Sequence, residues 1–182
     1  FVPSRGLGDV YKRQGYTGED GVEILLSSDT GIKLWDKLLE SGVTPCGLGC
    51  RDTLRLEAGM HLYGSEMDTT TTPYEASLGW IVNSTKEYIG KTILDNQKKN
   101  GIDKKLVALK LTKRNIARHD YPIMNEDIVI GKVTSGTWSP SLSVPIALAY
   151  VPTELSKVGS VVNVKIRGKL EAATVVKKPF YC

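Results

Sequence analysis

Three polar side chains near the start of the sequence could together bind a flat heterocycle. Glu23 is the one charge in the apolar run VEILL (22–26), and Arg51 opens the polar segment RDTLRLE (51–57). A carboxylate accepts hydrogen bonds from amino and ring N–H groups, whereas a guanidinium donates to carbonyl oxygens. Tyr16 adds an aromatic face on which a flat ring can stack. These three residues could therefore form one polar cluster around such a ligand.

A structural ion pair is the competing interpretation of the same charges. Glu23 or Glu57 could pair with Arg51 or Arg55 and satisfy the charges without a ligand, and spacing alone favours this role. No histidine is placed near a serine by the sequence, so no nucleophile–base pair is indicated.

The soft metal ligands of the chain are few and scattered. They are Cys46, Cys50, Cys182, His61 and His119. Cys46-x3-Cys50 has no second pair of cysteines or histidines nearby, so we expect no metal site. Three cysteines are too few for a disulfide framework and fit a reducing, cytoplasmic compartment.

Composition excludes several classes of function. Among the 182 residues, 41% are hydrophobic and 24% are charged, as in ordinary globular proteins. The net charge of +4 is too small to indicate nucleic acid. Basic residues thicken between Lys98 and Arg118, which we interpret as a solvated strand face with a charged edge. No apolar stretch is long enough to span a bilayer, so we expect no membrane contact.

Helices and short extended segments alternate before Lys104. Ser27 to Thr30 offer N-caps, and Gly42 and Gly59 offer helix stops. The spacing of apolar residues predicts a strand at 22–26 and a possible strand at the end of 75–82. Together with the caps and stops, it also predicts three helices, at 31–40, from 50 or 51 to 58, and from 84 or 85 to 96. The polar run QKKNG (97–101) is the expected domain boundary.

The pattern changes to short strands after Lys104. Alternating or β-branched runs occupy 105–111, 128–133, 146–151, 161–166 and 170–176, with glycine and proline between them. Such spacing predicts an antiparallel sandwich or barrel of roughly five to seven strands.

Seven segments, in order, carry a resemblance to a known family. They are GYTGEDGVEILL (15–26), GLGCRDTLRLEAGMHLYGSEMDTTTTPYEASLGWIV (47–82), YIGKTIL (88–94), KLVALKL (105–111), GKVTSGTWSPSL (131–142), IALAYVP (146–152) and KKPFY (177–181). Together they resemble the T-protein family, the aminomethyltransferases of the glycine cleavage system. The resemblance implies an α+β fold. Residues 15–100 would be the later part of a folate-binding domain, and residues 101–182 would be an antiparallel β-barrel.

The resemblance also implies a reaction and its partners. Members of this family take the methylene of an aminomethyl group carried on the lipoyl arm of the H-protein. They transfer it to tetrahydrofolate and release ammonia, a step of glycine catabolism. Glu23 and Arg51 match the family residues that contact the folate, and Tyr16 matches one that lines the same pocket. The implied partners are therefore the lipoylated H-protein and tetrahydrofolate.

Both ends of the chain depart from the family pattern. The run DVYKRQ (9–14) resembles translated adaptor sequence, so we expect residues 1–14 to be a non-native scar. The catalytic aspartate of the family would precede Gly15, and a folate-contacting tail residue would follow Cys182. We therefore expect little or no transferase activity from this chain alone.

Two other folate-binding families share the architecture. The folate-binding half of dimethylglycine or sarcosine dehydrogenases would follow a flavin-binding βαβ fingerprint, whereas DTTTTP (68–73) and the KKPFY ending favour the stand-alone transferase. Non-catalytic folate-dependent proteins of iron–sulfur cluster maintenance carry a K-G-C-Y-type motif. The corresponding segment here, LEAGMHLYGSEMD (56–68), lacks a cysteine. A folate-free binding module is the remaining alternative.

Overall fold

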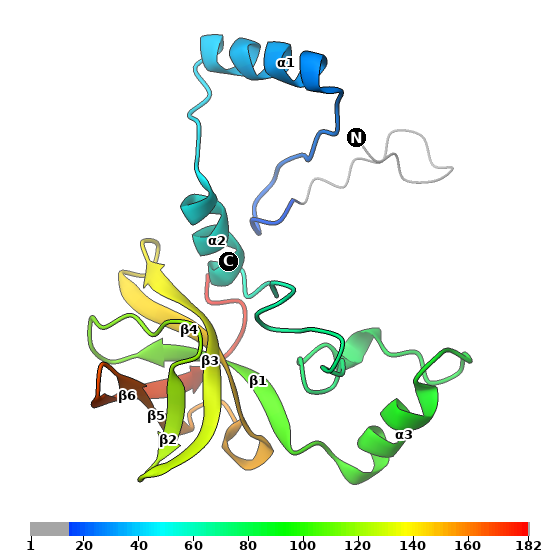
Figure 1. The fold of residues 1–182 in the computed structure, drawn as a ribbon, viewed down its shortest axis with the longest axis vertical. Coiled ribbons are helices and arrows are strands. Elements are labelled where there is room, and N and C mark those ends of the chain that lie inside the picture. Colours follow the sequence, from blue (N-terminus) through cyan, green and yellow to red (C-terminus); the bar gives the residue numbers. More distant parts are fainter. Residues whose placement is uncertain (1–14, 182) are drawn as a thin grey trace. The chain divides into compact units, whose positions relative to one another are not determined.

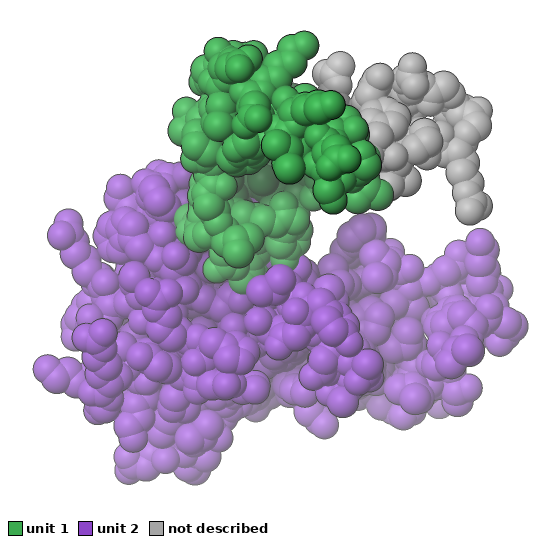
Figure 2. Space-filling view, turned by 45° about the horizontal axis from the view of Figure 1, so that its top comes forward, with its two compact units in different colours: residues 1–55 green, residues 56–182 purple. Residues whose placement is uncertain are grey.

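The computed structural model describes residues 15–181, which form two compact units. Unit 1 ends at Arg55 and unit 2 begins at Leu56 (Figure 2). The division falls inside the helix of residues 48–57. The predicted domains, 15–100 and 101–182, divide the chain at the polar run 97–101 rather than after Arg55, and they stay a prediction. The predicted scar, residues 1–14, lies outside the described residues.

Unit 1 contains helix α1 (Ser28–Glu40) and most of helix α2 (Leu48–Glu57) (Figure 1). The helix predicted at 31–40 is confirmed, although it begins earlier, after the N-cap Ser27. Gly42 follows its end with a φ of +83° and donates its N–H to the carbonyl of Leu39, as a glycine stop should. The apolar stripe of α1 stays open: Trp35 is 53% exposed.

The strand predicted at 22–26 is wrong. Residues 21–27 have no regular secondary structure, and Leu25 is 80% exposed. A strand needs a hydrogen-bonded neighbour, and the described part of the chain pairs none with this segment. The apolar composition alone was not sufficient to form one.

Helix α2 matches its prediction closely. It runs from Leu48 to Glu57 instead of from 50 or 51 to 58, and Gly59 follows it with a φ of +70°. Its fully buried apolar residue is Leu56, whereas Leu54 and Ala58, which the helical period places in the core, are only partly buried.

Turns dominate residues 60–90 of unit 2. The possible strand at the end of 75–82 is wrong, because this stretch forms turns and a 3-10 helix, η1 (Gly79–Ile81). Ser77 has a φ of +59°, which breaks an extended backbone. Helix α3 (Lys91–Asn100) begins later than predicted because Gly90, at a φ of +88°, precedes it. The polar run at 97–100 is its last turn, and Gly101 ends it.

A closed antiparallel β-barrel fills the rest of unit 2, as predicted. Its strands lie in the order β1-β4-β3-β2-β5-β6. They are β1 (Lys104–Leu111), β2 (Pro122–Asn125), β3 (Ile128–Ser139), β4 (Val144–Pro152), β5 (Val161–Ile166) and β6 (Lys169–Val176), with a 3-10 turn η2 (Thr153–Leu155) after β4 (Figure 1). β2 is the one strand that the sequence did not predict. The α+β fold class is confirmed.

Strands β1 and β4 are buried on both faces. Their inward residues, such as Leu109 and Ala149, belong to the barrel interior. Their outward residues, such as Leu106 and Leu148, form a second cluster with Leu56 from the end of α2. This outer cluster explains why β4 is an almost uninterrupted apolar run rather than an alternating one.

None of the helices in the described part of the chain combines the length and the apolar character needed to cross a membrane.

Tyr150 of β4 makes stability depend on alkaline pH. Its hydroxyl donates to the carbonyl of Glu66 at 2.7 Å, and burial, reinforced by the charge of Glu75, raises the pKa of Tyr150 from 10.0 to about 12. The phenol of Tyr150 ionises at lower pH in the unfolded chain than in the folded one. Its contribution to stability is therefore fully present below pH 10 and is lost as the pH rises towards about 12. We expect the urea midpoint of the chain to fall over this window. The urea midpoint of Tyr150→Phe should be lower below pH 10 and should fall less between pH 10 and about 12. An equally steep fall in both proteins would show that Tyr150 does not cause the pH dependence.

Candidate functional site

Arg51 contacts both of the other residues that the sequence singles out. Its Nη2 lies 3.5 Å from Oε1 of Glu23, and its Cζ lies 5.2 Å from the centroid of the Tyr16 ring. All three belong to unit 1. The structure therefore brings the predicted cluster together, with the guanidinium between the carboxylate and the aromatic ring.

The pair of Glu23 and Arg51 is loose and open to solvent. Their side chains are 66% and 50% exposed, and 3.5 Å is a long contact for an ion pair. Exposed pairs of this kind contribute at most about 1 kcal/mol to folding. The guanidinium has five N–H donors and the carboxylate has two acceptor oxygens, so most of their hydrogen-bonding capacity is available to a ligand.

Helix α2 holds Arg51 in its first turn. The backbone N–H groups of Cys50 and Arg51 both donate to the carbonyl of Gly47, at 3.0 and 3.3 Å. Glu23 comes from the irregular segment 21–27 rather than from a strand. Arg51 thus lies on a helix, whereas Glu23 lies on a segment without regular secondary structure.

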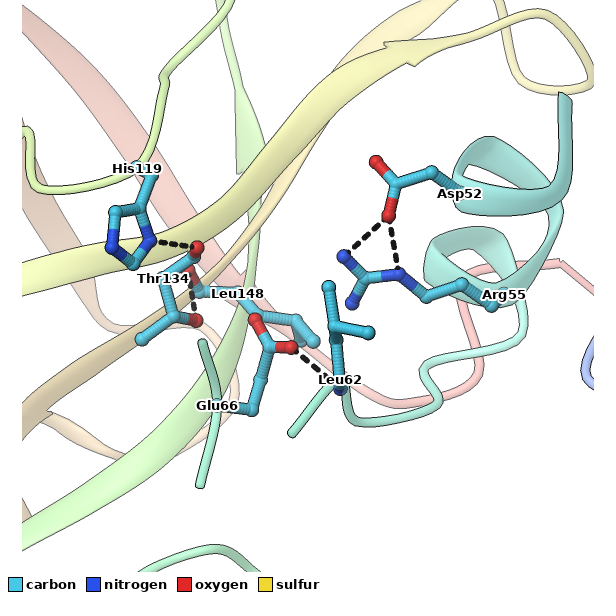
Figure 3. A network of polar contacts seen from close by, with 7 residues as sticks. All are labelled: Asp52, Arg55, Leu62, Glu66, His119, Thr134 and Leu148. Atoms are coloured by element: carbon cyan, nitrogen blue, oxygen red, sulfur yellow. Dashed lines mark hydrogen bonds and ion pairs between the residues drawn. The ribbon is translucent and has the colours of Figure 1, made fainter. Parts of the chain in front are cut away.

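Arg55, one helical turn after Arg51, has a different environment. Its Nε and Nη2 both bind Oδ1 of Asp52, at 2.8 and 2.7 Å (Figure 3). The Arg55 side chain is 2% exposed, and a buried guanidinium requires such partners. The structural ion pair that the sequence left open is therefore present between Glu23 and Arg51, and Arg55 pairs with Asp52. The exposed Arg51 is the arginine that a ligand can reach.

Glu57 is buried and receives three hydrogen bonds from the end of β3 and the turn that follows it. Ser139 Oγ donates to Oε1 at 2.5 Å, Ser141 Oγ donates to Oε2 at 2.8 Å, and the Ser141 N–H donates to Oε1 at 3.3 Å. The Glu57 carbonyl also accepts the N–H groups of Phe180 and Tyr181. This residue joins the end of α2, the β3–β4 turn and the C-terminal segment within unit 2.

Other polar side chains of unit 2 also contact the main chain. Glu66 is fully buried, and its Oε2 accepts the N–H of Leu62 at 2.8 Å (Figure 3). His119 Nδ1 lies 2.6 Å from the carbonyl of Thr134, and His61 Nε2 lies 2.7 Å from the carbonyl of Ala76. These contacts give both histidines structural partners.

The two cysteines of unit 1 lie close to each other. A hydrogen bond with Cys46 is the largest cause that raises the pKa of the Cys50 thiol above its ordinary value. Both residues are free and exposed. In residues 15–181 no group of three or more histidine, cysteine or acidic side chains is arranged to hold a metal ion.

Two protein-family models match the chain. The model described as "GCVT N-terminal domain" matches residues 7–86, and the one described as "Glycine cleavage T-protein C-terminal barrel domain" matches residues 104–181. The chain belongs to the glycine cleavage T-protein family. The second match coincides with the barrel of β1 to β6.

Individual members of the T-protein family agree with this assignment. An aminomethyltransferase of Synechococcus sp. (strain CC9311) is 58% identical over 171 residues, which are 93% of this chain and 46% of that protein. One from Nostoc sp. (strain PCC 7120) is 55% identical over 178 residues, 97% of this chain and 47% of that protein. The crystal structure of glycine cleavage system aminomethyltransferase T from Bartonella henselae matches with a TM-score of 0.87 at 36% identity, covering 92% of this chain and 48% of that one.

The chain spans about half the length of these T-protein relatives. Their names favour the aminomethyltransferases over the dehydrogenase and iron–sulfur maintenance proteins that share the architecture.

Proposed function

We propose that this chain contributes to an aminomethyltransferase that passes a methylene group to tetrahydrofolate. The methylene would come from the aminomethyl group on the lipoyl arm of the H-protein, with release of ammonia. In this proposal Glu23, Arg51 and Tyr16 form part of the folate site. The observation that carries it is the contact of all three side chains in a chain of the T-protein family.

The chemistry of the cluster suits the pterin ring of a folate. A pterin presents amino and ring N–H donors beside a carbonyl acceptor. The Glu23 carboxylate can accept from the donors, and the Arg51 guanidinium can donate to the carbonyl. The Tyr16 ring keeps the guanidinium plane oriented through the cation–π contact at 5.2 Å.

Ligand binding would also change the strength of the cluster. The Glu23 and Arg51 side chains are half or more exposed, so water screens their attraction. A flat ring placed against them would remove this water and strengthen each charged hydrogen bond. Residues that contribute little to folding stability would therefore contribute to the affinity for folate.

Substitution of the two charged residues tests this site. We expect Glu23→Gln and Arg51→Met each to weaken tetrahydrofolate binding by about 10- to 100-fold, because each removes a charge-assisted hydrogen bond. Quenching of tryptophan fluorescence under anaerobic conditions measures the dissociation constant. Glu40→Gln, which removes a carboxylate from the exposed end of α1, is the control and should bind as the parent chain does.

A full-length relative provides the second arm of this test. The same substitutions are made in the Synechococcus aminomethyltransferase, at the residues aligned with Glu23 and Arg51. There the KM for tetrahydrofolate should rise by a similar factor. Unchanged folate affinity and unchanged KM in that enzyme would refute the assignment of both residues.

A further inference from the structure

A recess lined by arginines lies between the β1–β2 loop and the β5–β6 turn of the barrel. Its volume is about 220 Å³, and Arg114, Arg118 and Arg167 line it together with Asn115 and Tyr121. No aspartate or glutamate belongs to its lining. Three positively charged side chains around one small recess repel one another, and a bound anion would relieve this repulsion.

The two stretches of sequence around the recess carry positive charges only. Residues 113–118 contain Lys113, Arg114 and Arg118, and residues 165–169 contain Lys165, Arg167 and Lys169, with no acidic residue in either stretch. The two stretches are separated in sequence, and the barrel brings them to one place. This concentration contrasts with the modest net charge of +4 for the whole chain.

The acidic side chains nearest in sequence have other partners. Glu171 is 3% exposed, and it accepts from Asn115 Nδ2 at 2.9 Å and pairs with Lys113 Nζ at 3.3 Å. Asp120 pairs with Lys132 at 3.0 Å and His119 at 3.3 Å. Across residues 15–181, no carboxylate lies within ion-pair distance of Arg114, Arg118 or Arg167.

The backbone around the recess is held firmly before any ligand arrives. Thr112 donates both its N–H and its hydroxyl to the carbonyl of Ala172, which fixes the start of the β1–β2 loop. Ala117 is fully buried within the same loop. The Cζ of Arg114 lies 5.8 Å from the Trp138 ring centroid, a cation–π contact that helps to hold this side chain in place.

Arg167 occupies a position that local structure alone does not favour. It has a φ of +48° and precedes Gly168, at +82°, in the two-residue turn between β5 and β6. Turns of this type favour Asn-Gly or Gly-Gly, because longer side chains are disfavoured at positive φ. An arginine here directs a charge to the recess at some cost to the turn.

We propose that this recess binds an oxyanion that carries two or more negative charges, either a phosphate group or a chain of carboxylates. Three guanidinium groups can surround such an anion and donate to several of its oxygens at once, whereas a single carboxylate would occupy only one or two of them. Tyr121, whose hydroxyl can donate a hydrogen bond, also belongs to the lining. This site is distinct in sequence from Glu23, Arg51 and Tyr16, and it does not depend on the proposed function.

Titration of the 182-residue chain with inorganic phosphate and with triglutamate tests the proposal. Calorimetry at constant ionic strength, with chloride as the balancing anion, should show saturable binding of at least one of them. Preference for phosphate identifies a phosphorylated ligand, and preference for triglutamate identifies a carboxylate chain. Arg118→Gln should weaken binding of the preferred anion by about tenfold. Arg167→Asn should have the same effect, although asparagine suits the turn better than arginine does.

A neighbouring lysine provides the matched control. Lys169→Gln removes one positive charge at the start of β6 but does not belong to the lining. It should change anion affinity by less than about twofold, the effect of a screened charge at a distance. The proposal is overturned if neither anion binds beyond the chloride background, or if Lys169→Gln weakens binding as much as Arg118→Gln does.

Discussion

Replacing Gly136 with alanine is expected to destabilise the barrel by roughly 3 kcal/mol. Gly136 lies in β3 opposite Ala147 of β4. A Cβ at this position would lie 2.1 Å from the carbonyl oxygen of Ala117 and 3.1 Å from its carbonyl carbon. Both atoms belong to the backbone of a buried residue, so neither can rotate away. The β1–β2 loop or strand β3 must move, and either movement disturbs the interior cluster.

Urea unfolding followed by circular dichroism measures this loss. Gly31→Ala in α1 is the control, because a Cβ at Gly31 meets nothing within 4 Å. There the exchange removes a helix-weakening glycine, and we expect a gain of up to about 1 kcal/mol if unit 1 contributes to the measured transition. A Gly136→Ala chain as stable as its parent would show that the β1–β2 loop does not pack this closely on β3.

Gly131 of the same strand makes a second close approach. Its added Cβ would lie 2.1 Å from the carbonyl oxygen of Tyr150. Both glycines occur in GKVTSGTWSPSL (131–142), so the reason for glycine there is backbone contact rather than a special φ. From the sequence alone, a glycine inside a strand indicates only a weak strand. The close approach of a neighbouring backbone becomes visible only in the structure.

Local patterns predicted the barrel strands well because each strand carries its own signal. The apolar run at 146–151 and the alternation at 161–166 are readable within a few residues. β2 was missed because it is only Pro122–Asn125, and its pairing with β3 and β5 is what makes it a strand. The segment at 22–26 shows the opposite error, since it has the apolar signal but lacks a paired neighbour.

The candidate site was predictable in its residue types but not in its supports. Glu23 stood out as the one charge in an apolar run, Tyr16 as an aromatic residue among glycines, and Arg51 as the first charge of a polar segment. The arginine recess did not, because Arg114 and Arg118 were interpreted with the lysines of a solvated strand face. They lie after β1 rather than on it, and only the barrel brings Arg167 beside them.

Loss of the Glu57 carboxylate is expected to be the second large effect on stability. Glu57→Ala removes the acceptor of the Ser139 and Ser141 hydroxyls and of the Ser141 N–H, all in a site where Glu57 is 3% exposed. The buried Ser139 hydroxyl left without a partner would cost about 1 to 3 kcal/mol, whereas water can reach the two donors of the exposed Ser141. We therefore expect a loss of about 3 kcal/mol in the free energy of unfolding, measured by urea titration.

Glu57→Gln separates the lost hydrogen bonds from the lost side-chain volume. Glutamine keeps one carbonyl acceptor for Ser139, and its amide can donate to the Ser141 hydroxyl, so the loss should be only about 1 kcal/mol. In a Ser139→Ala/Ser141→Ala background, two of the three donors to Glu57 are already absent. There Glu57→Ala should cost clearly less than it does in the parent chain, because interacting residues are not additive. Equal costs in the two backgrounds would mean that Glu57 stabilises unit 2 through packing rather than through these hydrogen bonds.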